Sequence, residues 1–299
     1  MQKSKQLLSG ILLVVLGAVS YGFLATMVGL SYKEGFGTTE VVFSQYLIGL
    51  FVLGIMTIGV FLRQKKVRVK VPLKQLLKLV VGGMTLGFIG FFYYWSIQYI
   101  PVSIAVVLLM QSIWISVVLE AIIDKKLPNT FQILAILTVL CGTLFATDAI
   151  HNLGQLNTKG LIFGSLSGLM YALMLLVMNR LGNEIHPSQK SFLMLLGATI
   201  IVVVIGAVNM PQVFDFSVFW KWGIWLALLG TILPPLLLNK GMPKTGIPLG
   251  AVLIAIEIPV SVSSAHFLLG EHVAFSQWMG ILLILVAVVL INFKSLFEK

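Results

Sequence analysis

Long apolar stretches alternate with short gaps along this chain, and the basic residues lie almost only in every second gap. Seventeen of the 20 Lys and Arg residues occupy the two termini and the second, fourth, sixth and eighth gaps. Cytoplasmic loops of membrane proteins are enriched in Lys and Arg, so we expect these gaps and both termini to be cytoplasmic. Two ends on one side of a membrane require an even number of crossings. The three exceptions, in odd-numbered gaps, are Lys33, Lys159 and Lys221.

The composition supports a membrane protein. The chain is 59% hydrophobic and 10% charged, with a mean hydropathy of +1.04, whereas about 25% of the residues of a soluble domain are charged. So few charges cannot cover a water-facing surface. The net charge of +10 would elsewhere suggest nucleic acid, but here membrane topology and anionic lipid headgroups explain the scattered basic residues. We therefore expect a lipid bilayer around the protein and no nucleic-acid partner.

Ten spans fit the apolar stretches, because a crossing helix needs about 20 residues. The stretch 79–119 is too long for one span and breaks at Pro101, since proline ends the preceding helix. Two short stretches join through Glu257. The first apolar stretch is longer than the core of a signal peptide, so we interpret it as an uncleaved helix. The predicted helices are 7–30, 41–62, 73–97, 102–120, 130–147, 160–179, 190–208, 218–238, 246–268 and 275–293.

The sequence also indicates two similar halves, 1–150 and 151–299. With an offset of about 146, Thr85 falls on Thr231 and Gln111 on Glu257; with an offset of about 150, Tyr21 falls on Tyr171. Five helices per half would invert the second half relative to the first. Inverted repeats are typical of secondary transporters, whose solute sites lie near the midplane where the repeats meet.

Glu257 is the one carboxylate near the middle of a predicted span. A charged carboxylate at that depth costs roughly 2.5–3.5 kcal/mol on insertion scales. It must therefore be protonated, be paired or face a wet cavity, and it is a candidate proton-coupling group. The alternative is a protonated side chain that hydrogen-bonds a neighbouring helix.

Three prolines are predicted to break helices near this carboxylate: Pro234, Pro235 and Pro259. Proline frees a backbone carbonyl, which a membrane tolerates only beside protein or cavity water. Two broken helices beside one carboxylate are typical of a midplane site.

Aromatic and amide side chains inside spans are candidates for the lining of a solute pocket. A phenol or an amide in hydrocarbon needs a partner or a cavity. Gln111 and Trp114 are three residues apart and share a helix face. The alternative for each is a hydrogen bond between helices. Besides Glu257, the candidates are Tyr21, Gln45, Gln111, Trp114, Tyr171 and Asn239.

The sequence offers no support for catalysis. There is no nucleophile elbow, no metal-ligand spacing and no phosphate-binding loop, so we expect no enzyme, no metal and no cofactor. Glycines at small-xxx-small spacing fit close packing within one bundle, so we expect a monomer.

Several motifs resemble those of the drug/metabolite transporter superfamily, in its EamA-like branch. The aromatic stretch from Phe92 to Pro101 is similar to that family's third helix, and Glu257-Ile258-Pro259 to its Glu-Pro element. Leu269-Gly270-Glu271, followed by Gln277 and Gly280, resembles its Leu-Gly-Glu signature. The resemblance spans the whole chain. It implies a central cavity lined by Tyr21, Tyr94, Gln111, Trp114, Tyr171 and Glu257.

The chain departs from the family's pattern in the first half. Gln111 stands where a Glu-Pro element might repeat, Asp124-Lys125 where Gly-Glu might, and Gln45 where many members have Arg. The last change removes a cation that could bind an anionic group.

The function expected from these features is secondary transport of a small organic solute across the cytoplasmic membrane. Export of an amino acid or similar metabolite is common in the family. The alternative is import of an organic cation, such as a quaternary amine, in an aromatic cage around Glu257. A membrane scaffold would need neither broken helices around a carboxylate nor an inverted repeat.

Overall fold

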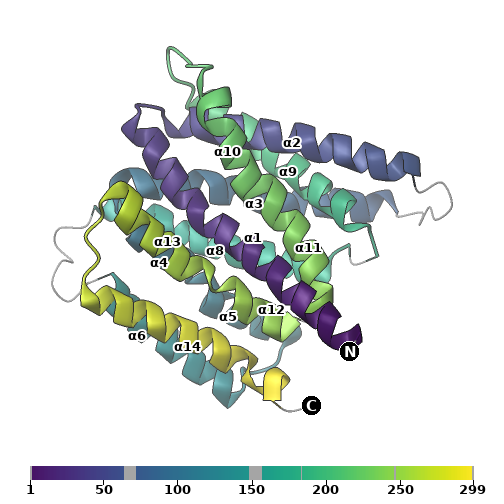
Figure 1. Ribbon diagram of the computed structural model, residues 1–299, viewed down its shortest axis with the longest axis vertical. Helices are drawn as coiled ribbons and strands as arrows, with labels where there is room; N and C mark the ends of the chain where they lie inside the picture. Colours follow the sequence, from purple (N-terminus) through teal and green to yellow (C-terminus); the bar gives the residue numbers. More distant parts are fainter. Residues whose placement is uncertain (1, 64–71, 148–156, 183, 246, 298–299) are drawn as a thin grey trace.

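The computed structural model describes residues 2–63, 72–147, 157–182, 184–245 and 247–297, and within these ranges every regular element is a helix. Figure 1 shows the helices as one bundle, with the start of α1 and the end of α14 close together at one corner. An all-helical membrane protein is therefore confirmed.

The first 150 residues fold into six helical segments. A sharp turn at Met110 and Gln111 divides the predicted fourth span into α4 and α5. The segments are α1 (Gln2–Lys33), α2 (Thr38–Arg63), α3 (Leu73–Tyr99), α4 (Val102–Leu109), α5 (Ser112–Asp124) and α6 (Thr130–Ala146).

The remaining residues repeat this order, with wide π-helical turns in two of the spans. The eighth predicted span is continuous from Phe219 to Thr245, and the ninth is divided at Ala255 and Ile256. The segments are α8 (Thr158–Arg180), α9 (Pro187–Val208), η1 (Phe219–Gly223), α10 (Ile224–Leu226), η2 (Ala227–Ile232), α11 (Leu233–Thr245), α12 (Ile247–Ile254), α13 (Glu257–Ser264), η3 (Ala265–Leu269) and α14 (Phe275–Phe297).

Eight helices of the described chain are long and apolar enough to cross a membrane by length and composition. Two further apolar helices, over Thr130–Ala146 and Phe275–Leu290, are shorter. These are the fifth and tenth of the predicted spans, so a count of ten crossings stays a prediction.

The expected interruption at Pro234 and Pro235 is wrong, because the helix runs through both prolines. The π-helical turns of η2 come directly before them and change which carbonyl each later N–H would reach. In that wide register, the missing N–H of Pro234 frees the carbonyl of Leu229. The hydroxyl of Ser20 on α1 donates to this carbonyl at 3.0 Å, so a neighbouring helix compensates for the proline.

At Pro259 the helix does break, a few residues earlier. Proline at 259 cannot donate to the carbonyl of Ala255, which instead accepts the N–H of Ile258 at 3.1 Å in a tighter turn. The break between α12 and α13 follows from this change of pairing.

The helix boundaries of the two halves match closely. α4 and α12 begin and end 145 residues apart, as do α5 and the helix that α13 and η3 form together. α3 and the helix from Phe219 to Thr245 are 146 residues apart at both ends. Lys125 and Gly270, which follow α5 and η3, are both left-handed, with φ of 51° and 74°.

Each half packs mainly against the other half rather than on itself. α1 lies along α11, α12 and α13, while α8 lies along α3, α4 and α5. α2 packs against the eighth span, and α9 against α3. Two mixed bundles result: α1 and α2 with the eighth and ninth spans, and α8 and α9 with α3, α4 and α5. α6 and α14 pair side by side at one edge (Figure 1).

Candidate functional site

Glu257 is the first residue of α13 and is buried, with 6% of its surface exposed. Its Oε2 atom has no hydrogen-bond partner in the described part of the chain. A position in the first turn of a helix favours a negative charge, because the peptide dipoles point their positive end there. A buried carboxyl group with an unused oxygen is suited to exchange a proton or to bind a polar group of a solute.

Three phenols surround this carboxyl group, each from a different helix. Glu257 interacts electrostatically with Tyr21 of α1, Tyr93 of α3 and Tyr171 of α8. The structure thus brings together three of the predicted site residues, from both mixed bundles. Tyr93 was not predicted, since its neighbour Tyr94 looked equally suitable and only the helix register decides which phenol turns toward Glu257.

Gln45 and Tyr94 form a second polar pair. The Tyr94 hydroxyl donates to Oε1 of Gln45, and both residues are buried. The backbone carbonyl of Tyr94 accepts the hydroxyl of Tyr32 at 3.0 Å. These bonds connect the interior of the bundle with its surface at Tyr32.

Gln111 and Trp114 lie apart from the Glu257 group. The Trp114 indole donates to Oε1 of Gln111 at 2.9 Å, and the Gln111 amide donates to Thr143 of α6 at 2.7 Å. The Trp114 ring packs in a small apolar cluster with Val139 of α6 and Ala287 of α14. Their polar atoms therefore join helices in this structure. The side chain of Asn239 lies outside the described residues.

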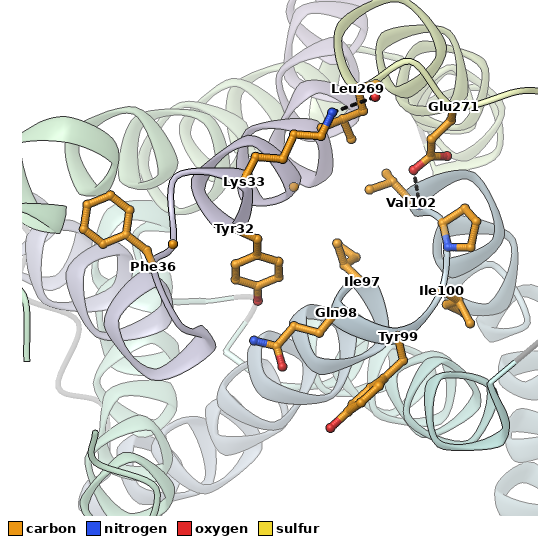
Figure 2. Close-up of a pocket in the computed structure, with 13 residues that line it drawn as sticks. Tyr32, Lys33, Phe36, Ile97, Gln98, Tyr99, Ile100, Val102, Leu269 and Glu271 are labelled. Carbon is orange, nitrogen blue, oxygen red and sulfur yellow. Dashed lines mark hydrogen bonds between the residues drawn. The ribbon is translucent and has the colours of Figure 1, made fainter. Parts of the chain in front are cut away.

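An open pocket of about 500 Å³ lies where α1 and α3 end and α4 begins. By the charge alternation this is the non-cytoplasmic end of the bundle. None of the predicted site residues lines it. Figure 2 shows Lys33 and Glu271 on one side of the pocket, flanking Leu269, with Gln98 and Tyr99 opposite.

Glu271 joins the two halves at this pocket. Its carboxylate accepts the backbone N–H of Val102 at 2.6 Å and that of Ser103 at 3.0 Å, and also the Ser103 hydroxyl at 2.8 Å. It thereby caps the first turn of α4, which has no capping side chain of its own. On the other side of Leu269, the Lys33 ammonium donates to the Leu269 carbonyl at 2.7 Å.

Two signals in the sequence could have indicated the pocket. Lys33 is one of the three lysines that break the charge alternation, and Glu271 belongs to the Leu-Gly-Glu motif. Neither reveals that the two residues meet around Leu269, because that contact joins positions more than 230 residues apart.

Comparisons with known proteins agree on one family. The model of the EamA-like transporter family matches residues 8–147 and 158–293. The threonine/homoserine exporter RhtA of two Salmonella typhimurium strains is 27% identical over 225 residues, covering 74% of this chain and 72% of the relative. An uncharacterized transporter of Synechocystis, sll1319, is 23% identical over 96% of this chain and 94% of its own length. A solved crystal structure superposes with a TM-score of 0.65 at 14% identity, covering 99% of both chains, which shows a shared fold.

Proposed function

The chain belongs to the EamA-like transporter family, and on that premise we propose that it exports an amino acid or a related small metabolite by alternating access. The observation that carries the proposal is the buried Glu257, set at a helix break and surrounded by Tyr21, Tyr93 and Tyr171 from both mixed bundles. A polar group in such a position is expected at a solute or proton pathway. The relative that is a threonine/homoserine exporter supports the solute class and the direction.

The proposed topology has ten crossings in the cytoplasmic membrane, with both termini cytoplasmic. Residues 1–150 and 151–299 would form two inverted five-helix repeats. The charge alternation supports the orientation, and the offsets of 145 and 146 residues between helix boundaries support the repeat.

The proposed unit of function is a monomer. The glycine pairs that could serve a dimer are used inside the chain: a Cβ on Gly87 would lie 2.8 Å from Ile201 of α9, and one on Gly164 would lie 2.6 Å from Leu108 of α4. These stripes therefore support packing within one bundle.

A counterflow experiment tests the transport proposal without assuming a coupling ion. Purified protein in liposomes is loaded with unlabelled solute, and uptake of the labelled solute is followed over a panel of L-threonine, L-homoserine, nucleobases and choline. We expect L-threonine or L-homoserine to exchange. Exchange of choline alone would favour the organic-cation alternative, for which the phenols around Glu257 are suited. A chain that exchanges no solute in the panel would support a scaffold.

We further propose that Glu257 couples transport to protons. In liposomes with an imposed pH gradient, wild-type transport should accelerate, while Glu257→Gln should exchange solute without responding to the gradient. Glu184→Gln is the matched control, since Glu184 is exposed in the loop between α8 and α9. A Glu257→Gln protein with the gradient response of the wild type would refute the coupling role.

A further inference from the structure

The pocket between α1, α3, α4 and η3 holds two opposite charges that do not pair with each other. Lys33 and Glu271 flank Leu269 (Figure 2), yet among the described residues neither makes an ion pair. The Lys33 side chain is exposed and uses one of its three N–H groups, on the Leu269 carbonyl. Two donors of the ammonium are left for a ligand.

The surroundings of these charges are polar in a complementary way. α1 ends at Lys33 and α3 ends at Tyr99, so carbonyl-rich helix ends face the pocket. Such ends favour a positive group. The Gln98 amide and the Tyr99 hydroxyl line the opposite wall and have no hydrogen-bond partner in the described part of the chain. The pocket therefore offers one site for an anion, at Lys33, and a separate one for a cation, at Glu271 and the helix ends.

The volume of about 500 Å³ is within the range of pockets that bind small molecules. The pocket also connects to the interior, since Tyr32 lines it and donates to the carbonyl of Tyr94, whose hydroxyl reaches Gln45. A ligand here would lie between the Gln45–Tyr94 pair and the solution.

We propose that this pocket is a second binding site, outside the Glu257 group, for a solute that carries both a carboxylate and an ammonium group. The carboxylate binds the free donors of Lys33, and the ammonium faces Glu271. The inference rests on the proposed function, which it deepens by assigning an exit site to the exported amino acid. The outer site holds the zwitterion after it leaves the interior and before it is released.

A labelling experiment reads this pocket alone. In a Cys141→Ser background, which removes the exposed native thiol, Gln98→Cys places one thiol on the pocket wall. The rate of its reaction with a maleimide is measured against increasing L-threonine. We expect L-threonine to slow the reaction, and 1-amino-2-propanol, the same molecule without its carboxylate, to require a concentration about tenfold higher.

Lys33→Gln then tests the assigned contact. It should raise the half-protecting concentration of L-threonine about tenfold and leave that of 1-amino-2-propanol unchanged, because only the first ligand has a carboxylate to lose. A purely structural effect would weaken both ligands. Lys159→Gln is the matched control: it removes another lysine of the same predicted side, which does not line the pocket.

The outcomes separate this inference from the proposed function. Protection by L-threonine that disappears selectively in Lys33→Gln supports the site. If L-threonine is transported in counterflow but never protects the thiol, or protects it equally with Lys33→Gln, the outer site is refuted and the transport proposal stands. Transport confined to solutes without a carboxylate would refute both.

Discussion

At the scale of single residues, Lys125 is held in a conformation that suits glycine. Its φ of 51° makes it the one non-glycine residue with positive φ in the described chain. Its counterpart in the second half, 145 residues on, is Gly270. A left-handed conformation costs a side-chain-bearing residue roughly 1–2 kcal/mol. The first half keeps lysine here because this loop carries cytoplasmic charge in the predicted topology.

We therefore predict that Lys125→Gly stabilises the protein by about 1 kcal/mol, as measured by thermal unfolding in detergent. Lys126→Gly is the control, because it removes the same charge at a residue without positive φ. A Lys125→Gly protein that melts below Lys126→Gly would show that the loop is not strained.

Glu271 should contribute to stability through its cap on α4. Glu271→Ala leaves the N–H groups of Val102 and Ser103 without acceptors, and loss of a helix cap typically costs about 1–2 kcal/mol. Glu271→Gln keeps one acceptor oxygen and should cost less. The exposed Glu184→Ala is the control in the same thermal unfolding assay. Equal melting of Glu271→Ala and the control would contradict the capping role.

Residue chemistry could be predicted from the sequence only where rarity singled a residue out. Glu257 stood out because carboxylates are expensive in a membrane. Trp114 and Gln111 shared a face as predicted, yet they bond to each other and to Thr143. Which neighbour satisfies a polar group depends on helix rotation, and a nearly uniform apolar sequence leaves that rotation undetermined.

At the scale of helices, α3 and α9 make the closest crossing that the glycines reveal. A Cβ on Gly83 would overlap the backbone of Met194, and one on Gly197 would overlap the carbonyl oxygen of Val80. Two helices can approach this closely only where both lack side chains at the contact. The pair fixes α9 of the second half onto α3 of the first.

Gly197→Ala should therefore destabilise the protein, by at least the 1–3 kcal/mol typical of overpacking (an order-of-magnitude figure, about 2 kcal/mol). Gly59→Ala is the matched control in α2, where a Cβ would meet nothing within 4 Å; it should be neutral or slightly stabilising, because alanine favours helix. Thermal unfolding compares the two. A Gly197→Ala protein as stable as Gly59→Ala would mean that the crossing is looser than the structure shows.

Helix boundaries followed well from charges, loops and Pro101, but proline effects did not. Pro234 and Pro235 sit within one helix, since π-helical turns and the Ser20 hydroxyl take up the freed carbonyl. Pro259 coincides with a real break. The difference depends on which neighbouring helix supplies a donor, and a tertiary contact of that kind is invisible in the sequence.

At the scale of the whole molecule, the two halves interleave. The sequence suggested that one half rocks against the other, but α1 packs on the second half and α8 on the first. Moving residues 1–150 as one body would separate these long contacts. Alternation between two faces is less costly if the mixed bundles move, with α1, α2 and the eighth and ninth spans against α3, α4, α5, α8 and α9.

The proposed orientation predicts where added reporters appear. A reporter after Lys299 should be cytoplasmic, and one inserted near Asn152, which lies outside the described residues, should be external. Paired fusions to green fluorescent protein and alkaline phosphatase distinguish the two sides. A cytoplasmic signal from the Asn152 insertion would break the ten-crossing topology.

Cross-linking the mixed bundles tests alternating access most directly. Ser103 and Glu271 touch across the pocket from different bundles, so Ser103→Cys with Glu271→Cys, in a Cys141→Ser background, can be joined by a short reducible cross-linker. The control pair, Thr26→Cys with Ser264→Cys, lies within one bundle, where the two hydroxyls are 2.7 Å apart. We predict that the first cross-link stops solute counterflow until it is reduced, while the control cross-link does not. Full counterflow with the first cross-link intact would contradict transport by movement of the two bundles.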